Sequence, residues 1–200
     1  MTMEAIMKHE ITQADIIPME EYGKNRVERR RAISQIKRDR RVEVGPPATF
    51  YFENYDTMWS QVHEMLYIEK GGADQVAGEL EAYNPLIPKG RELVATLMFE
   101  IDNPTQRARV LGGLGGVEET VTLELAGETI HGEAEEDLDR TNAEGKASSV
   151  QFIHIPFTDA QAAKFKQPNT RVTLAINHET YGHSAVIPER VRAALAEDLD

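Results

Sequence analysis

The chain has 200 residues, of which 40% are hydrophobic, and it carries a formal net charge of −12. This length suffices for one well-packed domain, or for one domain with a helical appendage. Because the sequence contains no Cys, it excludes disulfides, thiolate nucleophiles, cysteine zinc sites and iron–sulfur clusters held by this chain, so any metal must be bound by His, Asp, Glu or Tyr. The sequence shows neither a signal peptide nor an apolar run of the roughly 18 residues that a membrane helix needs, which predicts a cytoplasmic protein without membrane contact.

The first 90 residues read as mainly helical. Residues 1–11 are expected to be a disordered lead, and Thr12 is a candidate N-cap for a short turn that runs to Pro18. Further helices are predicted at residues 18–40, 55–70 and 74–83, with a short strand at 49–52 between the first two. The first helix has a thin apolar stripe, so most of its surface is expected to face solvent or a partner.

The remaining residues change to a β-rich pattern. Strands are predicted at residues 93–101, 119–125, 128–133, 148–157, 171–178 and 184–187, and short helices at 104–111, 159–165 and 188–199. The acidic stretch 133–146 is expected to be an exposed loop. The pattern favours an α+β fold with a curved, mainly antiparallel sheet or open barrel and the N-terminal helices packed on it. We expect residues 12–200 to form one domain, with a mainly helical part at 12–90 and a β-rich part at 91–200.

The glycine-rich stretch LGGLGGV at residues 111–117 resembles a phosphate-binding loop. Such loops need a strand before them and a helix N-terminus after them, whereas the predicted order here is the reverse. We therefore interpret this stretch as the end of a helix followed by a turn.

The net charge is unevenly distributed along the chain. Residues 24–41 hold nine Lys or Arg and only two acidic residues, a net charge of +7, which leaves −19 on the other 182 residues. The acidic remainder would repel DNA or RNA, so nucleic-acid binding is not expected. The basic residues either pair with the protein's own carboxylates or bind a partner protein. The candidate partner-binding residues are Arg29, Arg30, Arg31, Lys37 and Arg38.

Six of the thirteen aromatic residues lie between positions 50 and 72, and this block also contains His63. On a helix, His63 falls at the edge of the apolar face between Trp59 and Tyr67, with Asp56 two turns earlier. A carboxylate on one imidazole nitrogen would leave the other nitrogen for a ligand or a proton transfer. The alternative is a partly buried His that bonds to Asp56 or to a backbone carbonyl.

Three further His residues lie on predicted strands or turns. His154 and His178 share strand parity with apolar residues, which predicts that both point inward, and His183 follows the turn that contains Glu179 and Tyr181. Convergence of these side chains with His63 would make a nitrogen and oxygen metal site, whereas the alternative for HETYGH is a rigid turn. His131 falls on a polar face and His9 in the N-terminal lead, so neither is a candidate ligand.

The chain resembles a bacterial family of unknown function, domain of unknown function 3501. The resemblance rests on four stretches and covers residues 8–200: ERRRAI, VEVGPPATFYFENYDTMWSQVHEMLYIEKGG, AYNPLIPKGRELVATLMFEID and HETYGHSAVIP. It implies an association with rubrerythrin-like non-haem iron proteins and iron–sulfur oxidoreductases, and so a role near iron or peroxide metabolism.

Two functional hypotheses follow. The first is a metal-binding accessory protein in a redox or oxidative-stress setting, with one divalent metal ion, iron favoured, held by His63, His154, His178 and His183. Its supporting residues would be Asp56, Glu64, Tyr67, Glu179 and Tyr181. The second is a non-catalytic adaptor that docks an oxidoreductase through the basic helix at residues 24–41. The sequence leaves open whether any reaction is catalysed.

Overall fold

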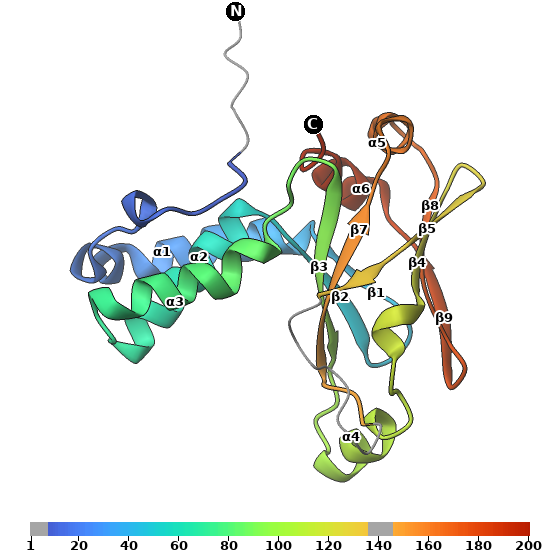
Figure 1. Cartoon of the computed structure of the whole chain (residues 1–200), viewed down its shortest axis with the longest axis horizontal. Coiled ribbons are helices and arrows are strands. Elements are labelled where there is room, and N and C mark those ends of the chain that lie inside the picture. The colour runs from blue at the N-terminus through green and yellow to red at the C-terminus, as the bar shows by residue number, and fades with distance from the viewer. Residues whose placement is uncertain (1–7, 136–145) are drawn as a thin grey trace, which may run out of the picture.

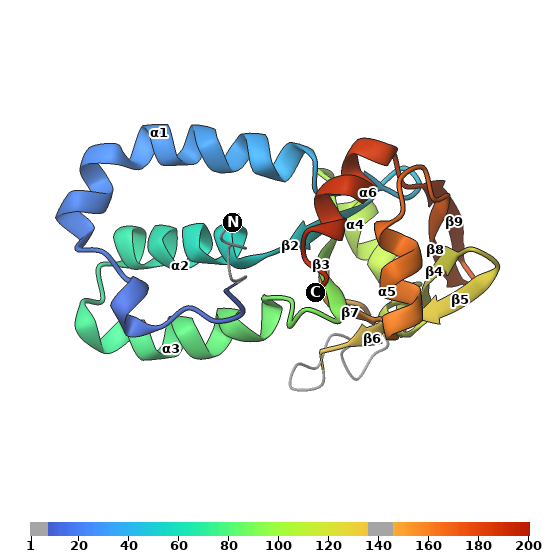
Figure 2. The same ribbon diagram turned by 90° about the horizontal axis from the view of Figure 1, so that it is seen from above.

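The computed structural model describes residues 8–135 and 146–200. A helical arm projects sideways from a β-sandwich (Figure 1). The arm contains helices α1 (Met19–Arg38), α2 (Tyr55–Glu69) and α3 (Ala73–Tyr83), with α2 lying between the other two (Figure 2). Among the described residues, no helix is both long and apolar enough to cross a membrane.

The sandwich consists of two antiparallel sheets. The first has the order β1 (Arg41–Glu43), β2 (Ala48–Glu53), β3 (Glu92–Phe99), β7 (Val150–Pro156) and β6 (Glu133–Ala134). The second has the order β5 (Glu128–His131), β4 (Val121–Leu125), β8 (Val172–His178) and β9 (Tyr181–Val186). The predicted α+β class is therefore confirmed, with the strands divided between two packed sheets that do not close into a barrel.

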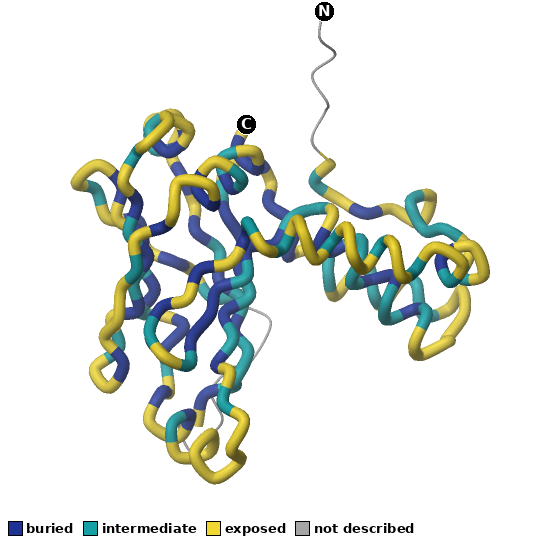
Figure 3. The backbone as a smooth tube through the Cα atoms, turned by 180° about the vertical axis from the view of Figure 1, so that it is seen from behind, coloured by how far each residue is buried: buried dark blue, intermediate teal, exposed yellow. Residues whose placement is uncertain are grey.

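The first sheet is covered on both faces. In β3, Leu93, Ala95 and Leu97 are fully buried in the sandwich core, whereas Val94 packs in the apolar cluster of the arm. Successive side chains point to opposite faces of a strand, so this near-continuous apolar run can serve two cores. Burial is densest inside the sandwich, and much of the outer surface of the arm is exposed (Figure 3).

Shorter elements close the sandwich. Helices α5 (Asp159–Lys166) and α6 (Glu189–Ala196) lie at one end, and α4 (Pro104–Leu111) lies at the other (Figure 1). Three short 3₁₀ turns, η1 (Gln13–Asp15), η2 (Asn84–Leu86) and η3 (Val117–Thr120), complete the described elements. Strand β1 lies outside the predicted strands, and the strand predicted at 128–133 reaches only the first residue of β6, because two or three residues are too few to show an alternating pattern.

Two expectations about irregular segments need correction. Ile11 is 1% exposed and packs in the apolar cluster of the arm, so the described part of the N-terminal lead is held in place. Residues 1–7 lie outside the described ranges. In the acidic stretch 133–146, Glu133–Ala134 forms β6 rather than loop, and residues 136–145 lie outside the described ranges.

Candidate functional site

His63 is fully buried inside the arm, and both of its ring nitrogens have partners. Nδ1 lies 2.7 Å from the main-chain oxygen of Trp59, and Nε2 lies 3.2 Å from the main-chain nitrogen of Ile17. A neutral ring that donates from Nδ1 and accepts at Nε2 satisfies both contacts. Burial lowers the pKa of His63, which favours this neutral form. The geometry matches the alternative of a buried His bonded to a backbone carbonyl.

The aromatic block at residues 50–72 supplies much of the contact between α1 and α2. The rings of Trp59 and His63 lie 3.7 Å apart, and Tyr22 of α1 contacts both rings. The hydroxyl of Tyr22 and the guanidinium of Arg26 both donate to Glu64. The Arg26 side chain holds the pKa of Glu64 below its usual range. In these contacts His63 and Glu64 serve to pack α1 against α2. The sequence had predicted His63 as a metal ligand and Glu64 as a supporting residue.

His154 lies between two carboxylates on the outer face of the first sheet. Its Nδ1 is 2.9 Å from Glu92 and its Nε2 is 2.8 Å from Glu135. The hydrogen bond with Glu92 is the main cause that raises the pKa of His154, against the opposing effect of burial. The expectation that His154 points into the main core is wrong, because Ile153 and Ile155 occupy that face of β7.

The two remaining candidate ligands lie near the β8–β9 turn. His178 bonds through Nε2 to the oxygen of Gly115 at 3.2 Å, and Thr180 donates to the oxygen of Gly113 at 2.7 Å. His183 is exposed, with its ring 4.3 Å from that of Tyr181. These hydrogen bonds from the HETYGH turn therefore hold the glycine-rich stretch in place. That stretch ends α4 and turns into η3, as the interpretation of residues 111–117 predicted.

The four His residues are thus placed in three parts of the fold. Within the described ranges, no group of three or more His, Asp or Glu residues is arranged to hold a metal ion. The supporting residues are also separated: Asp56 is exposed, Tyr67 stacks under Arg26, Glu179 is exposed, and Tyr181 donates to the oxygen of Val44. The excluded His131 is exposed, and His9 bonds to the oxygen of Pro88.

The basic segment divides into paired and unpaired cations. Arg26 pairs with Glu64, and the buried Arg40 pairs with Asp198, so part of the segment is neutralised internally. Lys24 and Arg41 form ion pairs at the surface, with Glu20 and Glu43. The five predicted partner-binding residues have no carboxylate partner among the described residues: Arg29, Arg30, Arg31, Lys37 and Arg38.

Arg29 differs from the other four unpaired cations. Its guanidinium lies over the ring of Trp59, 5.3 Å from the ring centroid. A cation over an aromatic face is attracted by the ring quadrupole, so Arg29 contributes to the arm itself. Its Nε is buried without a hydrogen-bond partner in the described structure.

Two adjoining recesses run along the outer side of α1. The first, of about 420 Å³, is lined by Arg26, Val27, Arg30, Arg31, Ser34 and Gln35. The second, of about 370 Å³, is lined by Ser34, Gln35, Lys37, Arg38, Arg41 and Tyr51. They share Ser34 and Gln35, so together they form one surface from the middle of the arm to the root of the sandwich. Every lining residue except Val27 can donate a hydrogen bond from its side chain.

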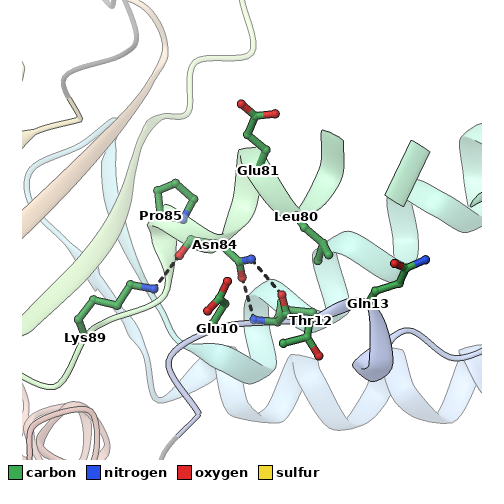
Figure 4. Close-up of a pocket in the computed structure, with 9 residues that line it drawn as sticks. Glu10, Thr12, Gln13, Leu80, Glu81, Asn84, Pro85 and Lys89 are labelled. Atoms are coloured by element: carbon green, nitrogen blue, oxygen red, sulfur yellow. Dashed lines mark hydrogen bonds between the residues drawn. The ribbon is translucent and has the colours of Figure 1, made fainter. Parts of the chain in front are cut away.

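A third recess, of about 730 Å³, lies where the N-terminal residues cross the end of α3 (Figure 4). The side chain of Asn84 accepts from the main-chain nitrogen of Ile11 at 2.8 Å and donates to its oxygen at 3.0 Å. Lys89 donates to the main-chain oxygen of Asn84 (Figure 4). Pro85 and Lys89 also line the neighbouring recess that contains His154. Asn84 thus explains the ordered path of residues 8–12, which the local sequence did not reveal.

Sequence reasoning missed the carboxylates that flank His154 and the neutral residues between the α1 cations. Glu92 and Glu135 are 43 positions apart and meet only because β3, β7 and β6 are neighbours in one sheet. Ser34 and Gln35 could have been found, because both lie on the helix face that carries Arg30, Arg31, Lys37 and Arg38.

Comparisons with known proteins agree with this picture of the fold. The family described as "Protein of unknown function (DUF3501)" matches residues 10–199. The chain is also similar to a crystal structure of a novel protein of unknown function from Burkholderia pseudomallei K96243, with 36% sequence identity and a TM-score of 0.88. The match covers 95% of this chain and 99% of the other. A search of curated proteins gave no match. The extent of the family match confirms the resemblance seen in the sequence, and the chain belongs to the DUF3501 family.

Proposed function

We propose that this protein is a non-catalytic adaptor that docks a partner protein through the outer surface of α1. The observation that carries the proposal is the set of four cations on this surface, Arg30, Arg31, Lys37 and Arg38, none of which has a carboxylate partner in the described structure. The family resemblance suggests an oxidoreductase, of the iron–sulfur or rubrerythrin-like kind, as the partner.

The arm suits such a role because α1 presents these cations on an outer surface that extends from the sandwich (Figure 1). Helix α1 is fixed by the aromatic contacts with α2 and by the Arg26–Glu64 pair. Its outer surface therefore remains available without unfolding any part of the arm. Arg is favoured at protein interfaces, where its guanidinium binds carboxylates in a fixed geometry.

A metal-binding accessory function stays a prediction with less support. His63 and His154 already have partners for both ring nitrogens. His178 and His183 lie elsewhere, near the β8–β9 turn. A shared site would require these parts of the fold to rearrange. The α1 surface requires no rearrangement, which is why we favour the adaptor.

Site-specific photo-cross-linking in cells of the source organism tests the proposal. A photoreactive amino acid at Val27, which is 65% exposed beside the first recess, should cross-link to one specific protein. The same group at Val186, which is 47% exposed on β9, should not cross-link to that protein. The Arg30→Glu/Arg31→Glu variant should lose the adduct. Absence of a specific adduct from Val27, or the same adduct from both positions, would contradict the adaptor function.

A further inference from the structure

The unpaired cations on α1 form two parallel rows. Residues seven positions apart lie on the same face of a helix, so Arg30 lies in line with Lys37, and Arg31 with Arg38. Ser34 falls between the members of the first pair and Gln35 between those of the second. Each row therefore reads cation, neutral hydrogen-bonding residue, cation. The two ends of a row are about 10 Å apart along the helix axis, at 1.5 Å per residue.

This pattern restricts the shape of a partner. A partner that places carboxylates at both ends of the rows, with neutral groups between them, matches the surface in charge and spacing. An α-helix with acidic residues at positions i and i+7 supplies that arrangement, because these positions also lie about 10 Å apart on one face. Val27 lies on the same surface, before the Arg30 end of the rows, and can contact an apolar side chain of the same helix.

We propose that the partner contacts α1 with an acidic helix, whose carboxylates lie in two groups one heptad apart. This inference rests on the proposed adaptor function and specifies what the adaptor recognises. The rows contain only two turns of helix, and the rest of the chain carries −19, so the favourable charge is limited to a short contact. A long polyanion such as duplex DNA would extend past the rows and meet the acidic remainder of the chain.

Two designed peptides test this geometry. Both are helical and have the same composition, but one has four Glu residues at positions i, i+1, i+7 and i+8, and the other has four Glu residues distributed around the helix. Fluorescence anisotropy at low salt should show that the striped peptide binds about tenfold more tightly, the equivalent of two or more exposed ion pairs. Its affinity should fall as salt is added, because exposed charges are screened.

Charge-reversal variants show whether binding occurs at α1. Arg30→Glu/Lys37→Glu should weaken binding of the striped peptide at least tenfold. Arg109→Glu/Arg171→Glu is the matched control, because it makes the same change of charge at two exposed positions of the sandwich. The control should bind the striped peptide with close to normal affinity. Circular dichroism of both variants checks that α1 has remained helical.

The outcomes separate this inference from the adaptor function. Equal affinity for the two peptides, or equal losses in the two variants, would overturn the acidic-helix inference. If the peptides give that result but Val27 still cross-links to a specific protein, the adaptor function remains supported, with a partner of another shape. Duplex DNA that binds more tightly than the striped peptide, and loses affinity in Arg30→Glu/Lys37→Glu, would overturn both.

Discussion

Arg40 and Asp198 form a buried ion pair that joins the end of the arm to the C-terminal residues of the chain. Arg40 follows α1, is 4% exposed, and also donates to the main-chain oxygens of Phe52, Glu53 and Ala194. One guanidinium thus connects α1, β2 and α6. Burial raises the pKa of Asp198 to about 6, while the adjacent Arg40 opposes this shift.

Replacing Arg40 should destabilise the protein strongly. Arg40→Met leaves Asp198 buried without its cation and removes the donor for three main-chain oxygens. We expect a loss of about 3 to 5 kcal/mol in the free energy of unfolding, measured by urea denaturation. Arg41→Met is the matched control. Arg41 is exposed, and its ion pair with Glu43 at the surface is long, at 3.8 Å. Its loss should stay within about 0.5 kcal/mol, and equal losses in the two variants would show that the buried pair has no special role.

Trp59 should be a main contributor to the stability of the arm. Its ring contacts Tyr22, His63 and Arg29, and its Nε1 donates to the oxygen of Asp15 at 3.0 Å. Trp59→Ala should reduce the free energy of unfolding by about 3 to 5 kcal/mol, as expected for a large aromatic residue in a packed cluster. Val27→Ala on the exposed side of α1 should change it by less than about 0.5 kcal/mol. A loss below about 1 kcal/mol for Trp59→Ala would mean that the aromatic contacts are dispensable.

The titration of His154 should make stability depend on pH. Its pKa is raised in the folded protein, so the protonated ring stabilises the fold fully below the ordinary value of about 6.5. That contribution is lost as pH rises through the folded pKa, because a neutral ring can donate to only one of Glu92 and Glu135. Lys89, Glu119 and Glu133 also line this recess and add to the local field.

Urea denaturation between pH 6 and pH 9 measures this effect. His154→Gln should lose the part of the pH dependence that lies above about pH 6.5, whereas His131→Gln on the exposed end of β5 should keep it. Nuclear magnetic resonance of the ring protons gives the His154 pKa directly. A value at or below the ordinary one would show that the two carboxylates do not hold the proton.

The elements that the sequence predicted well are those with local signals. Asn54 caps α2 by accepting from the nitrogen of Thr57, and Lys70 with its positive φ of 57° ends that helix directly before the Gly71–Gly72 pair, so both ends could be predicted. The alternation of β8 likewise predicted its last residue, His178. Capping and periodicity depend only on residues that are near in the sequence. They can therefore be recognised without knowledge of the fold.

The four candidate His ligands lie in separate parts of the fold, and their convergence could not be judged from the sequence because it depended on contacts between distant segments. Parity identified the residues that share a face of β7, but not which face meets the second sheet. The pairing of β3 with β7 decides that His154 meets Glu92 rather than another His. By contrast, the expectation that the basic helix could be neutralised internally was correct for Arg26 and Arg40, and the other residues could not be assigned before the fold was known.

His178 provides the final test, because its structural and metal-binding roles predict different results. In the structure, Nδ1 accepts from the nitrogen of Thr180 and Nε2 donates to the oxygen of Gly115, so one neutral tautomer satisfies both contacts. His178→Ala should therefore destabilise the β8–β9 turn by about 1 kcal/mol, a fall in melting temperature of about 2 to 4 °C for a chain of this size.

That fall should be the same with and without a metal chelator, because these contacts involve no metal. If His178 instead binds a metal in the folded state, the chelator should lower the melting temperature of the unaltered protein and leave His178→Ala unchanged. Glu179→Ala, on the exposed side of the same turn, controls for loss of a side chain at this place. A chelator effect present only while His178 is intact would restore the metal hypothesis and overturn the purely structural role.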